Sequence, residues 1–125
     1  AAKSPAELDR IRRAAHITAL AHREAVRVVI HRDRLDVYKV RSKVFGICGD
    51  KPGLTFKATE IAYAVLTEDG PARPAPGFAP RKGSWVNIPL SEVDREDAED
   101  WLATSYRLVA GSLTKRARAE LGIGA

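Results

Sequence analysis

Hydrophobic residues recur at helical spacing near both ends of the chain and once in its middle. Ser4-Pro5-Ala6-Glu7 combines a capping box with a proline at the first helical position, so a helix is predicted to begin at Pro5. At about 100° per residue its apolar face comprises Leu8, Ile11, Ala14, Ala15, Thr18, Ala19 and His22. Thr59 is predicted to cap a short helix from Glu60 to about Thr67, with Ile61, Val65 and Leu66 as its apolar stripe. The last helix is predicted to run from near Asp94 to about Ser112.

Between the first two helices the pattern changes to the alternation and β-branched content typical of strands. Residues 25–31 are predicted as one strand, and residues 36–47 as two strands joined by a tight turn at 41–43. In the first strand of that pair Tyr38 and Val40 are expected on one face, and Val37, Lys39 and Arg41 on the other.

The remaining strands flank the middle helix. Residues 54–57 alternate as a fourth strand and residues 84–90 are predicted as a fifth, whereas residues 70–83 hold four of the seven prolines and are predicted as an ordered surface loop. Short connections between the early strands require antiparallel neighbours. The prediction is an α+β fold with an antiparallel sheet of about five strands packed by helices, in the order α-β-β-β-β-α-β-α, and a single domain over residues 1–125.

Composition and cysteine content indicate the class of protein and its cellular compartment. The chain of 125 residues is 45% hydrophobic and 30% charged, which is typical of a globular protein. No apolar run approaches the roughly 20 residues of a membrane span. Cys48 is the single cysteine, so no internal disulfide forms, and we expect a cytoplasmic protein without a membrane partner.

Charge is unevenly distributed. Net charge is +5; residues 1–57 hold 13 Lys and Arg against 6 Asp and Glu, and residues 58–125 hold 8 against 10. Two interpretations stay open, an anionic partner for the first half or a solvated surface that keeps the protein soluble.

The candidate phosphate-binding residues are basic side chains on strands, hairpins and the proline-rich loop. They are Arg27, Arg32, Arg34, Lys39, Arg41, Lys43, Lys57, Arg81 and Lys82. Such residues suit backbone contact with nucleic acid, although strand edges also carry Lys and Arg to prevent edge pairing. The chain has only Asn87 to read adenine, so little sequence preference is expected.

No catalytic constellation or metal site is indicated. His16, His22, His31 and Cys48 lie at no paired ligand spacing, so neither a metal nor another cofactor is expected. There is no Gly-x-Ser-x-Gly elbow. An enzyme working through His31 or Cys48 is the weakest of three functional hypotheses, because neither has an evident partner in the sequence.

Several segments together resemble the MmcQ/YjbR family. They are residues 36–45, 54–57, 73–76, 83–86 and 104–109, which follow in the same order along nearly the whole chain. The resemblance implies a CyaY-like α+β fold with a double-wing DNA-binding motif, whose wings here would be the hairpin around Arg41–Lys43 and the loop through Arg81–Lys82. The chain departs from the family pattern at His22-Arg23, at residues 31–34 and at Ser42.

Two functions therefore compete. The first is a non-enzymatic protein that binds double-stranded DNA through its phosphate backbone. The second, left open because family members occur beside antibiotic-biosynthesis genes, binds or sequesters a planar small molecule in a pocket lined by His31, Tyr38, Phe78 and Trp85. Ile17 and Leu20 lie off the apolar face of the first helix, so a monomer and a homodimer are both compatible with the sequence.

Overall fold

The computed structural model describes residues 3–30, 34–49, 53–75 and 84–123. Its helices are α1 (Pro5–Ala21), α2 (Glu60–Glu68), α3 (Arg95–Gly111) and α4 (Lys115–Glu120), with a short 3-10 turn at Leu90–Glu92. Its strands are β1 (Ala25–Ile30), β2 (Leu35–Val40), β3 (Lys43–Cys48), β4 (Leu54–Lys57), β5 (Arg73–Pro74) and β6 (Trp85–Ile88).

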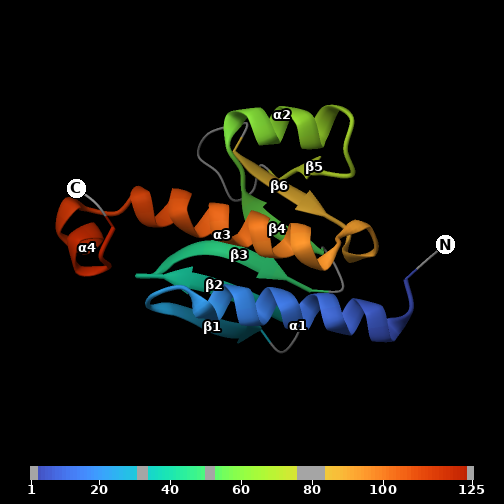
Figure 1. Ribbon diagram of the computed structural model, residues 1–125, viewed down its shortest axis with the longest axis horizontal. Coiled ribbons are helices and arrows are strands. Elements are labelled where there is room, and N and C mark those ends of the chain that lie inside the picture. The colour runs from blue at the N-terminus through green and yellow to red at the C-terminus, as the bar shows by residue number, and fades with distance from the viewer. Residues whose placement is uncertain (1–2, 31–33, 50–52, 76–83, 124–125) are drawn as a thin grey trace.

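The strands form one antiparallel sheet in the order β1-β2-β3-β4-β6-β5 (Figure 1). The predicted α+β class and element order are confirmed. The sheet has one strand more than expected, because Arg73 and Pro74 of the proline-rich stretch pair with Asn87 and Val86 of β6. No helix among the described residues is long and apolar enough to cross a membrane.

Strand register divides the side chains between two faces. One row across the strands is Arg27, Tyr38, Gly46, Phe56 and Val86, and we call its face the helix face because α1 and α3 lie against it (Figure 1). The neighbouring row is Val28, Val37, Ile47, Thr55, Asn87 and Arg73, and we call its face the second face. The predicted division of Tyr38 and Lys39 between opposite faces is confirmed.

The core fills the helix face. Phe56 stacks on Trp101 of α3 with ring centroids 5.2 Å apart, and Phe45 meets Tyr106 edge-on at 5.3 Å. Tyr38, Phe45 and Leu102 are fully buried there. The Gly46 position has no room for a side chain, since a Cβ would lie 2.7 Å from Leu102 Cδ2.

Ser105 joins α3 to the sheet where the ladder between β3 and β4 ends. Its Oγ donates to the Phe45 carbonyl at 2.6 Å and accepts from the Lys57 amide at 2.9 Å. One buried hydroxyl thus satisfies two backbone groups that the strands leave unpaired. The same region holds a β-bulge, because the register with β2 skips Phe45.

The helices follow the sequence with one exception. Ser4 and Glu7 form the predicted capping box, and Ile11, Ala14, Ala15 and Ala19 are the buried side of α1. In α2 the predicted apolar stripe is wrong at two of its three residues: Ile61 is 79% and Val65 61% exposed. Its third residue, Leu66, packs against the core together with Ala62 and Tyr63. The direction in which a short helix docks is decided by its tertiary contacts and not by its own hydrophobic pattern.

Candidate nucleic-acid interface

The charged side chains that strand register places on the second face are all basic. They are Lys39 of β2, Lys57 of β4 and Arg73 of β5. The one acidic residue in the described strands, Asp36, lies on the helix face opposite Cys48. The second face therefore presents positive charge without an acid among its described strand residues.

These cations lie at regular intervals across the sheet. Lys39 and Lys57 are separated by β3, and Lys57 and Arg73 by β6. Neighbouring strands are about 4.8 Å apart, so each interval measures about 10 Å across the sheet at the backbone. Arg73 is in addition displaced along the strands, because it lies opposite Asn87 and Lys57 lies opposite Trp85. Lys39 and Lys57 are partly exposed, and neither makes a side-chain hydrogen bond or an ion pair with the residues that the structure describes.

Arg73 begins a short polar network on the same face. Its Nη2 donates to Asn87 Oδ1 at 3.3 Å, and Asn87 Nδ2 donates to Thr55 Oγ1 at 3.0 Å. Thr55 and Asn87 are buried, whereas Arg73 is exposed and keeps further N–H donors for a partner. The sequence analysis did not include these three residues in the site, although the strand alternation of Thr55 and Asn87 is visible in it.

Two of the predicted basic residues form ion pairs with acidic residues of the same chain. Arg41 donates to both carboxylate oxygens of Glu24, at 2.7 and 2.9 Å, and lies 2.9 Å from Glu120 of α4. These bonds lower the pKa of Glu24 and raise that of Arg41. Arg27 lies 3.6 Å from Asp36 and 3.3 Å from His16 Nδ1. Arg41 in particular stabilises the hairpin end, which makes it a poor probe of ligand binding.

The β2–β3 hairpin is a tight two-residue turn. Arg41 and Ser42 have φ of 48° and 71°, the left-handed values that a type I′ turn requires at both positions. Lys43 follows as an exposed residue at its end, and Arg34 is exposed at the opposite end of β2. Among the remaining predicted contacts, Arg32, Arg81 and Lys82 lie outside the described residues.

The four residues of the alternative small-molecule pocket are not brought together by the described part of the chain. Tyr38 lies on the helix face, 6.2 Å from the Phe45 ring and 6.3 Å from the His16 ring, while Trp85 lies on the second face opposite Lys57. Because the sheet separates them, Tyr38 and Trp85 do not line one pocket. His31 and Phe78 lie outside the described residues.

The described histidines and the cysteine pack within the fold and form no metal site. His22 stacks on Tyr106 at 4.4 Å, and burial, with a smaller effect of Arg107, lowers its pKa. Cys48 is buried. Within the described ranges no group of three His, Cys, Asp or Glu side chains could hold a metal ion.

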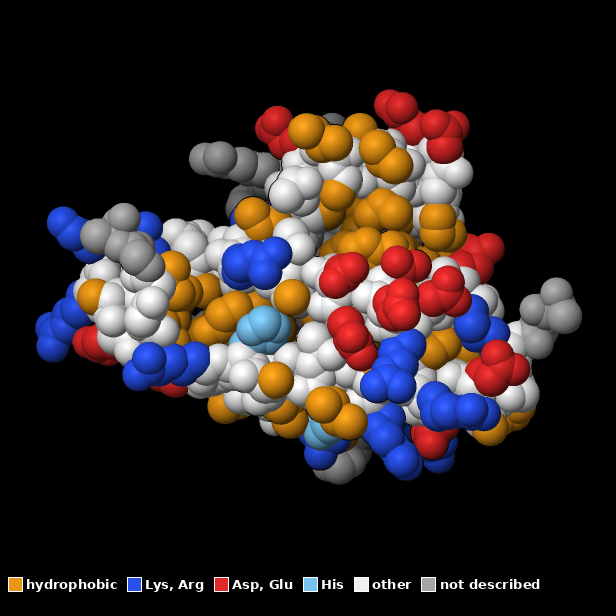
Figure 2. Space-filling model, in the orientation of Figure 1, with side chains coloured by type: hydrophobic (Ala, Val, Ile, Leu, Met, Phe, Trp, Pro, Cys, Tyr) orange, Lys and Arg blue, Asp and Glu red, His pale blue; other side chains and the backbone are white. Residues whose placement is uncertain are grey.

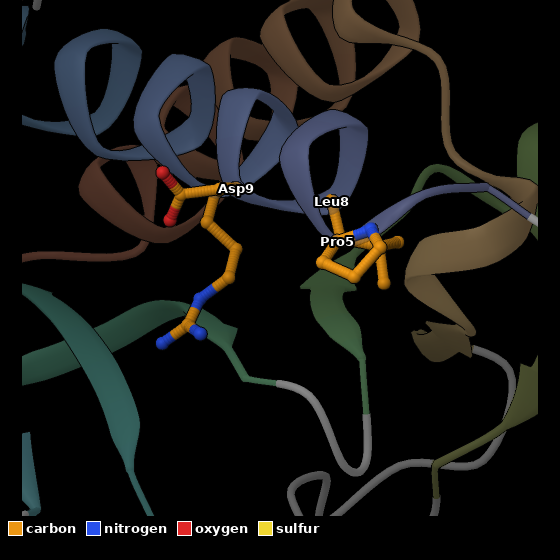
Figure 3. Close-up of a pocket in the computed structure, with 4 residues that line it drawn as sticks. Pro5, Leu8 and Asp9 are labelled. Carbon is orange, nitrogen blue, oxygen red and sulfur yellow. The ribbon is translucent and has the colours of Figure 1, made fainter.

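The hollows beside α1 offer no better site. One of about 240 Å³ is lined by Pro5, Leu8, Asp9 and Arg12 at the start of the helix (Figure 3). Another, of about 280 Å³, lies between α1 and the β1–β2 pair, where Asp9 and Asp36 accompany Arg13 and Arg27. Ion pairs at 4.0 Å (Arg13–Asp9) and 3.6 Å (Arg27–Asp36) balance much of its charge.

These features define a small α+β domain with a helix-covered antiparallel sheet and a basic second face. The family model named YjbR matches residues 8–108, so the chain belongs to the YjbR family. A crystal structure of the Deinococcus radiodurans protein DR2400, with a domain of the DUF419 family model, is similar at a TM-score of 0.70 and 25% identity, over 87% of this chain and 86% of that chain. No curated protein matches the sequence.

Proposed function

We propose that the protein binds the phosphate backbone of double-stranded DNA through the second face of its sheet, without catalysing a reaction. Lys39, Lys57 and Arg73 supply the contacts, whereas the exposed Lys43 at the hairpin end pairs with Val40 and so does not lie on this face. The observation that carries the proposal is that every charged residue of the described strands on this face is basic.

The charge on the helix side of the molecule also favours DNA binding through the second face. Acidic residues gather on the outer side of α3, where Figure 2 shows a row of Asp and Glu side chains, and Glu96 and Asp97 stand in its first turn. Figure 2 shows Lys and Arg side chains of α1 and α4 on that side as well, so its charge is mixed, whereas the described strand residues of the second face carry positive charge alone. The field of the molecule therefore favours the second face as the side that an anionic duplex approaches. Intervals of about 10 Å correspond to about three base-pair steps of 3.4 Å along the duplex.

The salt dependence of binding tests the proposal quantitatively. Three phosphate contacts predict a slope of about −2.7 for log K against log salt, at about −0.9 per contact. The measurement is fluorescence anisotropy of a labelled random-sequence duplex across a salt series. Lys39→Glu with Lys57→Glu is expected to weaken binding at least about tenfold and to lower the slope by about 2.

The matched control keeps the net charge change and moves it elsewhere. Lys115→Glu with Arg107→Glu alters two exposed residues of α4 and α3 by the same four charges and is expected to change affinity much less. Equal losses in the two double variants would show that net charge and not the second face governs binding. Absence of binding by the unaltered protein at low salt would overturn the proposal.

A further inference from the structure

Exposed hydrophobic side chains concentrate at one edge of the fold. Among the described residues they are Ile17 (62%) and Leu20 (38%) of α1, and Val26 (52%), Val28 (43%) and Ile30 (42%) of β1. Figure 2 shows hydrophobic side chains along its lower margin, where Figure 1 places α1 and β1. The remaining exposed large hydrophobics, Ile61 and Val65, lie apart on α2. A concentration of this kind marks an interaction surface.

The backbone of β1 is also available for pairing. Among the described strands β1 pairs with β2 alone, so its six residues leave an edge about 20 Å long whose N–H and C=O groups no described strand pairs. The opposite edge is protected: β5 has two residues, and Pro74 has no N–H to donate. Short strands and prolines are the devices that block edge pairing, and β1 has neither.

We propose that β1 pairs antiparallel with β1 of a second copy of this chain, so that two sheets join across a two-fold axis. An axis at Val28 places Val26 of each copy opposite Ile30 of the other. Directly opposite residues of antiparallel strands share a face, so Val26, Val28 and Ile30 of both copies form one apolar patch on the joined second face. A two-fold contact needs a self-complementary surface, and a strand that pairs with itself supplies one.

Helix α1 adds a second layer to the contact. Asp9, Arg13, His16 and Leu20 share one side of α1, since they are spaced by four, three and four residues. His16 Nδ1 lies 3.3 Å from Arg27 of β1, so this side of the helix is turned toward the β1 edge. Leu20 and its neighbour Ile17 therefore stand beside the edge that the second copy approaches.

The size of the edge predicts a reversible dimer. An edge of about 20 Å and two layers of about 10 Å each give a footprint of about 400 Å². A standard interface takes about 800 Å² per partner, close to a tenth of the 7719 Å² surface of this chain. The smaller footprint predicts a dissociation constant in the micromolar range and not an obligate dimer.

Sedimentation velocity without nucleic acid tests the dimer. From about 5 μM to about 500 μM the weight-average sedimentation coefficient is expected to rise from the monomer toward the dimer value, as a micromolar constant requires. The variant Val26→Lys with Val28→Lys places like charges across the pairing and is expected to stay monomeric at all concentrations. The control Ile61→Lys with Val65→Lys makes the same chemical change on α2 and is expected to dimerise like the unaltered protein.

Amide hydrogen exchange identifies the contact. Amides of β1 that point away from β2 are expected to exchange more slowly as concentration rises, and not to do so in the Val26→Lys, Val28→Lys variant. Circular dichroism and thermal unfolding of both variants confirm that they fold. A chain that stays monomeric at 500 μM (about the top of the tested range) overturns the proposal and leaves the edge to an extended segment of another protein. A dimer that only the α2 variant disrupts overturns it as well.

Discussion

The helix face and the second face use alternate residues of the same strands, yet they meet different surroundings. On β2 the fully buried Tyr38 is followed by the partly exposed Lys39, and on β4 the buried Phe56 is followed by the partly exposed Lys57. α1 and α3 close the first surface, whereas the second carries partly exposed lysines and the exposed valines of β1 around a buried centre of Val37, Ile47 and Thr55. The comparison teaches that, of two neighbouring residues in a strand, one can contribute to stability and the other to interaction. Mutating them one at a time separates the two contributions.

The sharpest test replaces neighbours on β4. Phe56→Ala is expected to lower the free energy of unfolding by about 3–5 kcal/mol, because it empties a buried site stacked on Trp101. Lys57→Ala is expected to change it by less than about 0.5 kcal/mol. Urea denaturation followed by circular dichroism measures both. Similar losses for the two variants would contradict the division between the faces.

A second test concerns how the helix face is held. Ser105→Ala removes a hydroxyl that serves two buried backbone groups, so the free energy of unfolding is expected to fall by about 1–3 kcal/mol. Thr104→Ala is the matched control, since it makes a similar change at the preceding, partly exposed position of α3. If the control loses as much stability, the bridge between β3 and β4 is not the cause.

The smallest effect tests a buried group on the helix face that makes no bond. The Tyr38 hydroxyl is buried and has no hydrogen-bond partner among the residues that the structure describes, and burial raises its pKa. Tyr38→Phe is therefore expected to increase the free energy of unfolding by about 1 kcal/mol. Tyr106→Phe should act in the opposite direction, because the Tyr106 hydroxyl donates to the Arg23 carbonyl at 2.7 Å. Thermal unfolding of the pair gives the two signs directly.

Local patterns in the sequence were sufficient for most of the architecture. The capping box of α1, the alternation along β2 and the antiparallel order follow from spacing within a few residues, and the structure confirms them. The apolar stripe predicted for α2 is wrong at Ile61 and Val65, which face outward, and right at Leu66, which packs against the core. A nine-residue helix has two plausible sides, and only contacts distant in the sequence select between them.

The candidate site was predicted only in part, because some of its contacts are local in the sequence and others join distant residues. Lys39 and Lys57 were found from strand alternation, which is a local property. The partners of Arg41 could not be predicted in this way, because Glu24 lies just before β1 and Glu120 lies at the end of α4. Nor was the chain of hydrogen bonds from Arg73 to Thr55, which requires β5 beside β6.

The contacts around Arg41 have a consequence for the order in which the molecule assembles. The hairpin end, the entry to β1 and the last helix meet there, and the nearby bonds Tyr106–Arg23 and Arg23–Leu121 join residues 83 and 98 positions apart. Closing such long segments is slow compared with forming a hairpin or a helix. On a ribosome, the Arg41 end of the hairpin waits for nearly the whole of this sequence before Glu120 reaches it. A pause in translation before α4 would therefore leave β1 and the hairpin formed but without their contacts to α4. During that pause a chaperone or a protease has access to them.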